Sequence, residues 1–205
     1  MIINLSKMCE DFSSSVQFLG KQNQCDFYTG QMYNNKYHGQ GTLKTKNGIL
    51  YKGGFINGER SGRGIQQFSK DGYYSGKWLK GQRSGYGIQC QSGNFYKGQF
   101  REDLMHGFGE LFINISAYRQ YYKGYFKDGN FNGVGLLEYI ENEIMVKSYN
   151  GDFINGVYDG SGTLIFDGKE YVGEFKNGEF HGSGTMTTVH GIVTTGNWDY
   201  GKLIL

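Results

Sequence analysis

Residues 51–65 read YKGGFINGERSGRGI, and this short pattern decides the fold. It opens with Tyr, Gly and Phe at every second position, so these three side chains share one face of an extended strand. It closes with two glycines that are again two positions apart, Gly62 and Gly64, and an apolar residue that follows directly. The segment between the two halves, residues 56–61, carries turn residues. The stretch therefore predicts one β-hairpin.

The pattern recurs along most of the chain. Seven tyrosines, spaced by 23, 23, 22, 26, 27 and 22 residues, are each followed by a glycine two positions later and a large apolar residue four positions later. Paired glycines follow at positions eleven and thirteen, and a half unit starts at Thr194. The defining residues are Tyr28, Gly30 and Met32; Tyr51, Gly53 and Phe55; Tyr74, Gly76 and Trp78; Tyr96, Gly98 and Phe100; Tyr122, Gly124 and Phe126; Tyr149, Gly151 and Phe153; and Tyr171, Gly173 and Phe175.

The glycines argue for order, although the chain of 205 residues contains 35 glycines and no proline. A glycine-rich chain is often a flexible linker, but linkers lack aromatic residues. In this chain aromatic residues make up 17%. Most glycines fall on the repeat positions. Between aromatic residues on one face, a glycine lets a ring from a neighbouring strand lie flat over bare backbone. We expect an all-β fold, a single elongated and twisted antiparallel sheet of consecutive hairpins, about 65–70 Å long at roughly 4.8 Å per strand.

The repeats define three segments. Residues 1–27 form a non-repeat cap, for which helix and strand both stay open, that covers part of the aromatic face. Residues 28–193 form seven repeats, and residues 194–205 form the half repeat. Two junctions between repeats, 112–121 and 138–148, are longer than the rest, and insertions in a repeat array usually map to loops.

Three junctions carry the strongest signals for tight hairpin turns, namely Asn47-Gly48, Asp71-Gly72 and Asp167-Gly168.

The repeated unit resembles that of the MORN (membrane occupation and recognition nexus) family, over residues 28–201. The resemblance is very specific for the hairpin sheet described above and poorly specific for function. The unit departs from the family pattern at several positions: Asn35 and Asp103 replace a mid-loop glycine, and Gln66 and Gln89 replace leucine. Thr194 also stands where tyrosine is usual. These departures are interpreted as tolerated drift.

No catalytic, metal or cofactor site is expected. His38, His106 and His181 occupy the same repeat position, which indicates a structural role. The Gly-x-Gly pairs never form the strand-to-helix turn that cradles a phosphate.

An acidic cluster and the cysteines are likewise not expected to form a catalytic or metal site. Glu138, Glu141 and Glu143 lie in a long junction, where a solvated loop is favoured over a cation site or an acid–base pair. The three cysteines, Cys9, Cys25 and Cys90, are an odd number without paired spacing, which indicates reduced thiols and a cytoplasmic protein.

Charge is divided along the chain. Residues 36–101 contain twelve lysines and arginines against two acids, and residues 102–205 contain seven against fourteen. Drift on a solvated surface, an acidic partner or anionic lipid at the basic half, and antiparallel pairing of two copies as a homodimer all remain open. A net charge of only +2 argues against nucleic-acid binding. The candidate partner- or lipid-binding residues are Lys52, Lys77, Lys97 and Lys123 on the wet face, and Tyr118, Arg119, Tyr121 and Met145 in the long junctions.

Two further surfaces are candidates for partners. A single sheet has no second layer, so we expect a groove with exposed Tyr and Phe that accepts a helix or an extended peptide, with a self-satisfied sheet as the alternative. The last strand ends in Leu203, Ile204 and Leu205, an open apolar edge that could pair with another chain.

The resemblance implies a function in outline. Stand-alone arrays of this length resemble radial-spoke-head and other axonemal or cytoskeletal scaffolds, which predicts a non-catalytic scaffold in the cytoplasm, on the cytoskeleton or in a cilium. The alternatives are a membrane-apposed adaptor that binds anionic lipid through its basic half, and a regulatory module of a separate lipid kinase.

Overall fold

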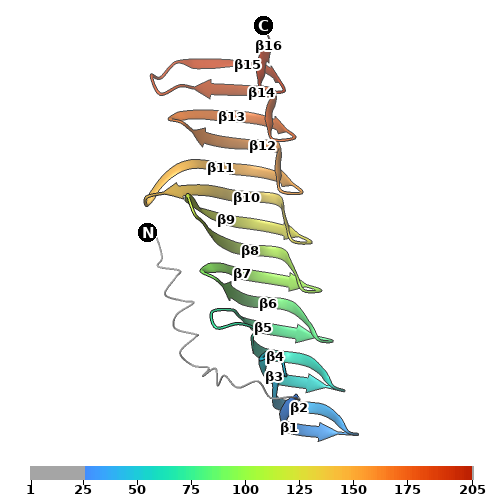
Figure 1. Ribbon diagram of the computed structural model, residues 1–205. Coiled ribbons are helices and arrows are strands. Elements are labelled where there is room, and N and C mark those ends of the chain that lie inside the picture. Colours follow the sequence, from blue (N-terminus) through green and yellow to red (C-terminus); the bar gives the residue numbers. More distant parts are fainter. Residues whose placement is uncertain (1–25, 205) are drawn as a thin grey trace. The chain divides into compact units, whose positions relative to one another are not determined.

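The computed structural model describes residues 26–204, which form strands and turns and no helix. Over this range, therefore, no helix is long and apolar enough to cross a membrane. The strands are antiparallel, and their order in the sheet is their order in the chain (Figure 1). The predicted all-β fold of consecutive hairpins is confirmed. The predicted cap lies outside the described residues, apart from its last two.

The chain divides into two compact units, 1–104 and 105–205. The strands of the first unit are β1 (Phe27–Tyr33), β2 (Lys36–Lys44), β3 (Leu50–Ile56), β4 (Glu59–Gln67), β5 (Tyr73–Leu79), β6 (Gln82–Gln91) and β7 (Asn94–Arg101). Those of the second unit are β8 (Leu104–Ile115), β9 (Tyr118–Lys127), β10 (Asn130–Glu141), β11 (Ile144–Ile154), β12 (Val157–Phe166), β13 (Lys169–Lys176), β14 (Glu179–Thr187), β15 (Val193–Asp199) and β16 (Lys202–Ile204).

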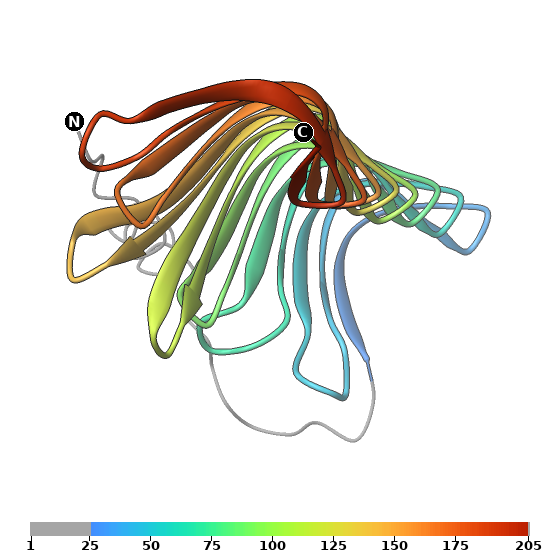
Figure 2. The same ribbon diagram turned by 90° about the horizontal axis from the view of Figure 1, so that it is seen from above.

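The turn inside each repeat is two residues long. In the repeat quoted first, Asn57 and Gly58 have φ angles of 53° and 91°. Two successive residues with positive φ make the turn whose twist matches that of the strands, which explains the Asn-Gly sequence. In each unit these turns lie at one end of the strands and the junctions lie at the other (Figure 2).

The junctions follow the sequence prediction only in part. Asp167 and Gly168 form the expected two-residue turn, with φ angles of 49° and 69°. The prediction is wrong for Asn47-Gly48 and Asp71-Gly72, which lie in wider loops at 45–49 and 68–72. The reason is a different closing hydrogen bond. Thr45 N–H donates to Ile49 O at 2.8 Å, so the loop spans five residues.

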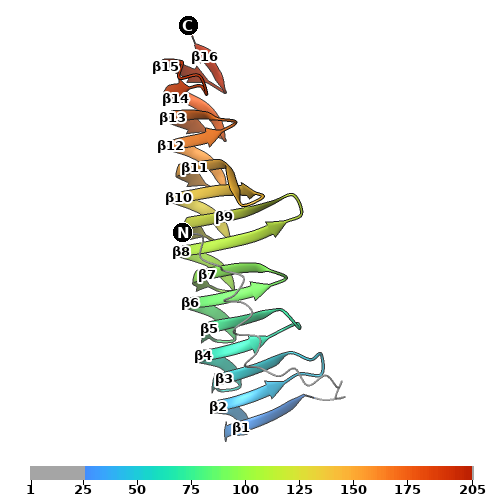
Figure 3. The same ribbon diagram turned by 90° about the vertical axis from the view of Figure 1, so that its left-hand side faces the viewer.

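The two long junctions are strands and not loops, which corrects the second expectation. β8 and β9 pair up to Ile115 opposite Tyr118, and β10 and β11 pair up to Glu141 opposite Ile144 (Figure 3). Only residues 116–117 and 142–143 remain as turns. The added residues are mostly β-branched, aromatic or long, so the insertion lengthens the ladder instead of looping out.

Six of the motif tyrosines, those other than Tyr96, lie over a cross-strand pair of glycines. Gly53 on β3 is paired with Gly64 on β4. A Cβ atom on Gly53 would lie 2.5 Å from the Gly64 Cα, and one on Gly64 would lie 2.3 Å from the Tyr51 hydroxyl oxygen. The expected ring from a neighbouring strand therefore covers Gly64, whereas Gly53 is covered by the tyrosine of its own strand.

The tyrosine hydroxyl has a role that the sequence reading missed. Tyr51 Oη donates to the Gly54 carbonyl at 3.0 Å, three residues along the chain. The other motif tyrosines donate in the same way to Gln31, Lys77, Gln99, Tyr125, Asp152 and Glu174. The bond satisfies a buried phenol and fixes the ring over the glycines.

The motif rings form the core of each unit. Tyrosines alternate with Phe or Trp in edge-to-face contacts, such as Tyr51 to Trp78 at 5.4 Å and Tyr149 to Phe175 at 5.0 Å between ring centroids. Exposure of Tyr51 is only 1%, and Phe153 is equally buried. The motif rings therefore do not supply the exposed Tyr and Phe expected of a groove, because each glycine pair lets the rings pack against backbone. The open surface of this face is built by other residues.

Candidate functional site

The residue nine positions after each motif tyrosine builds the outer layer of the aromatic face. In order these residues are Tyr37, Arg60, Arg83, Met105, Phe131, Tyr158 and Phe180, with Leu203 at the matching position of the half repeat. All are half-buried. Four of them are aromatic and stack flat on their tyrosine, with ring centroids 3.7–4.0 Å apart. This position therefore decides what the face presents to a partner.

Two repeats of the first unit place arginine at this position. The Arg60 guanidinium carbon lies 4.2 Å from the centroid of the Trp78 ring and 5.9 Å from that of Tyr51. The Arg83 guanidinium carbon lies 5.1 Å from the Phe100 centroid. A planar guanidinium thus takes the place of a stacked ring, in the geometry of cation–π contacts.

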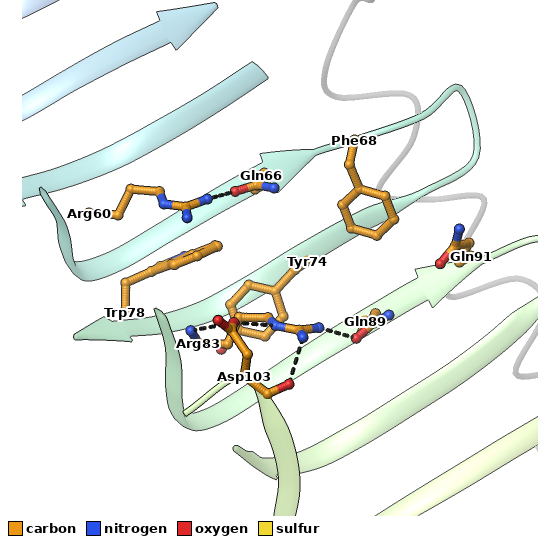
Figure 4. A pocket seen from close by; sticks show the side chains of 9 residues that line it. All are labelled: Arg60, Gln66, Phe68, Tyr74, Trp78, Arg83, Gln89, Gln91 and Asp103. Atoms are coloured by element: carbon orange, nitrogen blue, oxygen red, sulfur yellow. Dashed lines mark hydrogen bonds and ion pairs between the residues drawn. The ribbon is translucent and has the colours of Figure 1, made fainter. Parts of the chain in front are cut away.

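Each arginine reaches a glutamine on its own strand and the turn of the next hairpin. Arg60 donates through Nη1 to Gln66 Oε1 and through Nη2 to the Gly81 carbonyl at 2.7 Å. Arg83 donates through Nη1 to Gln89 Oε1. Figure 4 shows both side chains running in the same direction, each ending at its glutamine.

Arg83 also forms an ion pair. Its Nε lies 2.9 Å from Asp103 Oδ1, and its Nη2 donates to the Asp103 carbonyl at 2.6 Å. The same carboxylate oxygen accepts the Arg83 backbone N–H at 2.9 Å. Asp103 holds a φ of 67°, the left-handed region that the mid-loop glycine occupies elsewhere.

Three of the departures from the repeat pattern, Gln66, Gln89 and Asp103, are therefore partners of the two arginines, which corrects their interpretation as drift. Gln66 and Gln89 stand where other repeats have leucine or methionine, and only these two repeats carry arginine. A leucine there would leave a guanidinium N–H without its acceptor, and a glycine in place of Asp103 would leave Arg83 without its counter-charge.

These side chains line a groove of about 430 Å³ on the aromatic face of the first unit (Figure 4). Phe68, Tyr74 and Trp78 supply apolar walls. Burial lowers the pKa of the Arg60 guanidinium, and the negative charge of Asp103 opposes this shift. Burial raises the pKa of Tyr74 to about 12, and the nearby Arg83 charge opposes that shift.

The groove offers charged and polar groups that can bind a ligand. Its polar groups are guanidinium and amide donors and one carboxylate that is paired with Arg83. Within residues 26–204, no group of three or more His, Cys, Asp or Glu side chains is placed to hold a metal ion. His106 and His181 each direct Nδ1 toward an aspartate near the next turn, with separations of 3.5 and 3.6 Å from Asp128 and Asp199.

The four candidate lysines lie on the opposite face, as expected. Lys52, Lys77 and Lys123 are exposed, and Lys97 is half-buried. Lys77 is the register partner of the exposed Arg63, which places two cations side by side. Lys123 belongs to the second unit, where its Nζ lies 3.1 Å from Glu110 Oε1.

The four candidates of the long junctions are not gathered into one site. Tyr118 and Tyr121 are three residues apart on β9, so they face opposite sides of the sheet. Tyr118 contacts Tyr139 at 5.4 Å between ring centroids, and burial raises the pKa of Tyr121 to about 12. Arg119 forms an ion pair with Glu143, and Met145 is exposed on β11.

The acidic cluster is likewise dispersed. Glu138 and Glu141 lie on β10 and face opposite sides, and Glu143 lies in the turn paired with Arg119. The expectation of a solvated loop is therefore wrong, since the strands continue through it.

The face opposite the aromatic one is not wet throughout. Gln67, Tyr73, Cys90 and Phe95 are register neighbours across β4–β7 and are 1–7% exposed. Cys90 is also disulfide-bonded, so the expectation of reduced thiols is wrong for this residue. Three cysteines allow one pair and one remainder, and Cys9 and Cys25 lie outside the described residues.

The last strand offers little free edge within the described residues. β16 has three residues and pairs with β15. Leu203 packs over Gly196, where a Cβ atom would lie 2.7 Å from a Leu203 methyl carbon, and Ile204 is exposed. Leu205 lies outside the described residues.

The division of charge coincides with the division into units. Residues 26–104 contain twelve basic and five acidic residues, and residues 105–204 contain seven and twelve. The groove lies in the basic unit.

Comparison with known proteins identifies the repeat. The family model of the MORN repeat matches seven segments, at residues 28–49, 51–73, 74–95, 96–112, 122–141, 149–168 and 171–189. No curated protein matches the chain. Repeats of this family generally bind other proteins or membranes and are generally non-catalytic.

Proposed function

The chain belongs to the MORN repeat family, and from this premise we propose that it is a non-catalytic scaffold that docks partner proteins on the aromatic face of its first unit. The observation that carries the proposal is the groove lined by Arg60 and Arg83. Elsewhere the same position holds an apolar side chain, which covers the tyrosine without any partner. A half-buried charged network gives little stability over such a side chain, so its presence favours a role in recognition.

The wider setting is part of the same proposal. By resemblance to stand-alone arrays of this length, the scaffold belongs to a cytoskeletal or axonemal assembly of the radial-spoke-head kind, in the cytoplasm. A disulfide at Cys90 argues for an oxidising compartment instead. A count of free thiols in protein isolated from its own cells decides between them: three free thiols support the cytoplasm, and one contradicts it.

Reconstitution tests the scaffold. Proteins that co-purify with the chain are expressed separately and mixed with the purified chain, and complex formation is measured by sedimentation velocity. We expect at least one to form a stoichiometric complex. If none does, while anionic vesicles bind the chain, the scaffold proposal is wrong.

A membrane-apposed adaptor is the second candidate, favoured by one observation. Lys52, Arg63 and Lys77 are exposed together on the face opposite the groove. Each cation near an anionic surface contributes about 1 kcal/mol. The candidate predicts salt-dependent sedimentation with phosphatidylserine vesicles that is lost when Lys52, Lys77 and Lys97 are changed to Glu. Changing Lys127, Lys169 and Lys202 of the second unit to Glu is the control, and an equal loss there contradicts a specific lipid face.

The two remaining interpretations each predict a different experimental result. Pairing of two copies, basic unit on acidic unit, predicts a homodimer in sedimentation velocity that dissociates as salt is added. A regulatory module of a lipid kinase predicts that such a kinase is among the reconstituted partners and changes its activity in the complex.

A further inference from the structure

The groove of the first unit contains one cation that forms no ion pair with a carboxylate of the described residues. Arg83 is neutralised by Asp103. Arg60 donates only to neutral oxygens, those of Gln66 and Gly81. Across residues 26–204 no carboxylate forms an ion pair with Arg60.

The free hydrogen-bonding capacity of the groove is that of a donor. A guanidinium has five N–H groups. Arg60 donates one from Nη1 to Gln66 and one from Nη2 to Gly81. Because Gln66 and Gln89 accept through Oε1, their amide N–H groups are turned away from the arginines. A ligand that bonds the remaining N–H groups of Arg60 must therefore supply acceptors.

We propose that the groove binds the carboxylate of a glutamate or aspartate side chain of the partner protein, and that Arg60 pairs it. This inference rests on the proposed scaffold function and specifies the chemistry of its partner. The formal charges of Arg60, Arg83 and Asp103 leave a single positive charge, which one carboxylate balances. A phosphate dianion would leave an excess negative charge beside Asp103.

The walls fit an amino-acid side chain. Phe68, Tyr74 and Trp78 provide apolar surface for the methylene groups of the acid. A volume of about 430 Å³ is that of a small-ligand pocket, so the groove accommodates a side chain with its neighbouring backbone. The low exposure of Arg60 strengthens the charge-assisted bonds relative to those of a surface arginine.

The chain carries its own reporter for this site. Trp78 and Trp198 are its two tryptophans, and Trp78 lies under Arg60. Trp198 occupies the position at which other repeats have Phe, so Trp198→Phe leaves Trp78 as the only tryptophan. In this background the full chain is titrated with a short acetylated and amidated polyglutamate peptide, and Trp78 emission is followed.

Arg60→Gln is compared with Arg63→Gln. Both remove one positive charge from β4, but Arg63 is exposed on the opposite face. We expect saturable binding by the parent and by Arg63→Gln within about twofold, and a loss of at least about tenfold in Arg60→Gln. Arg60→Lys, which keeps the charge without the planar fork, is expected to fall between them. Thermal melts establish that each variant is folded.

Other results overturn the inference. These are no saturable change with polyglutamate, an equal change with polyglutamine, or an equal loss in Arg63→Gln. A phosphoserine peptide that binds at least about tenfold tighter would make this a phosphate site, and free glutamate that binds as tightly as the peptide would make it a small-molecule site. Vesicle binding that depends on Arg60 would assign the groove to lipid.

The scaffold proposal fails separately. If polyglutamate does not bind, while a reconstituted partner binds the parent and Arg60→Gln equally, the carboxylate site is wrong and the scaffold stands. If polyglutamate binds at Arg60 but no protein forms a complex, the carboxylate site stands and the scaffold is wrong.

Discussion

The first and second units cover the same tyrosine in two ways. In the second unit, Phe131, Tyr158 and Phe180 stack on it, next to Leu or Met six positions on. In two repeats of the first unit, Arg60 and Arg83 take that place beside glutamines, whereas Tyr37 of its first repeat stacks on Tyr28 as in the second unit. The layer beneath is alike in both, with a tyrosine over two glycines. The difference indicates that the fold depends on the lower layer, whereas the residue nine positions after the tyrosine can vary without changing the fold.

The layer common to both units should tolerate the least change. Gly64→Ala and Gly135→Ala each place a Cβ atom within 2.3–2.4 Å of a tyrosine hydroxyl oxygen and against its ring. Each should lower the free energy of unfolding by about 3 kcal/mol, the upper part of the range for overpacking. Urea denaturation measures this, with Ser75→Ala as the control. A large difference between the two glycines would contradict a common lower layer.

Moving the arginine into the second unit is the next strongest test. Phe131→Arg removes a ring stacked at 3.7 Å on Tyr122 and supplies no glutamine, because Leu137 stands at the partner position. We expect a loss of about 2–3 kcal/mol in urea denaturation, from lost apolar contact and an unpaired guanidinium. Phe131→Leu is the control for the ring alone. An arginine that is tolerated as well as leucine would contradict the need for a coupled glutamine.

The coupling itself is measured in the first unit. Gln66→Leu alone leaves an Arg60 N–H without its acceptor and should cost about 1–2 kcal/mol. Combined with Arg60→Phe, which recreates the arrangement of the second unit, most of that loss should be recovered. The double-mutant cycle gives the coupling energy, for which we expect about 1 kcal/mol. Additive effects would separate the glutamine from the arginine.

The tyrosine hydroxyl should matter equally in the two units. Tyr51→Phe and Tyr122→Phe each remove one hydrogen bond to a backbone carbonyl and leave the ring in place. A loss of about 1 kcal/mol is expected for each in thermal or urea melts. Tyr86→Phe, at an exposed ring, is the control and should change little.

Ionisation of the buried phenols does not change the free energy of unfolding at neutral pH and lowers it only in alkali. Burial raises the pKa of Tyr51 and Tyr74 to about 12, from 10.0 for the free side chain. A raised folded-state pKa gives stability that is complete below about pH 10 and is lost as pH rises through 12.

Absorbance of the phenolate and urea melts at increasing pH measure this loss. Burial also raises the pKa of Tyr122, over which no guanidinium lies. Tyr51 and Tyr74 should therefore ionise before Tyr122 and Tyr149, whose pKa values burial raises further. The opposite order would contradict the opposing charge assigned to the arginines.

The hairpin array could be predicted because it depends on spacing alone. Tyr, Gly and Phe at alternate positions, followed by paired glycines, have one satisfactory arrangement, in which a ring lies over glycine backbone. Strand lengths at 112–121 and 138–148 were mispredicted, since an insertion can continue a ladder or leave it, and the paired neighbours decide which. Whether Asn47-Gly48 forms a tight turn was likewise decided by the Thr45 to Ile49 hydrogen bond.

By itself the sequence determined the fold of this protein, its repeat boundaries and the face on which Lys52, Lys77 and Lys97 lie, because these follow from periodicity. Only the tertiary structure decided that Arg60, Gln66, Arg83, Gln89 and Asp103 act together. The groove requires side chains on three successive strands, β4 to β6, in the loop after β4 and in the turn that follows β7 to meet over buried rings. Spacing along the chain does not encode which side chains meet across strands, so residues that read as drift became the candidate site.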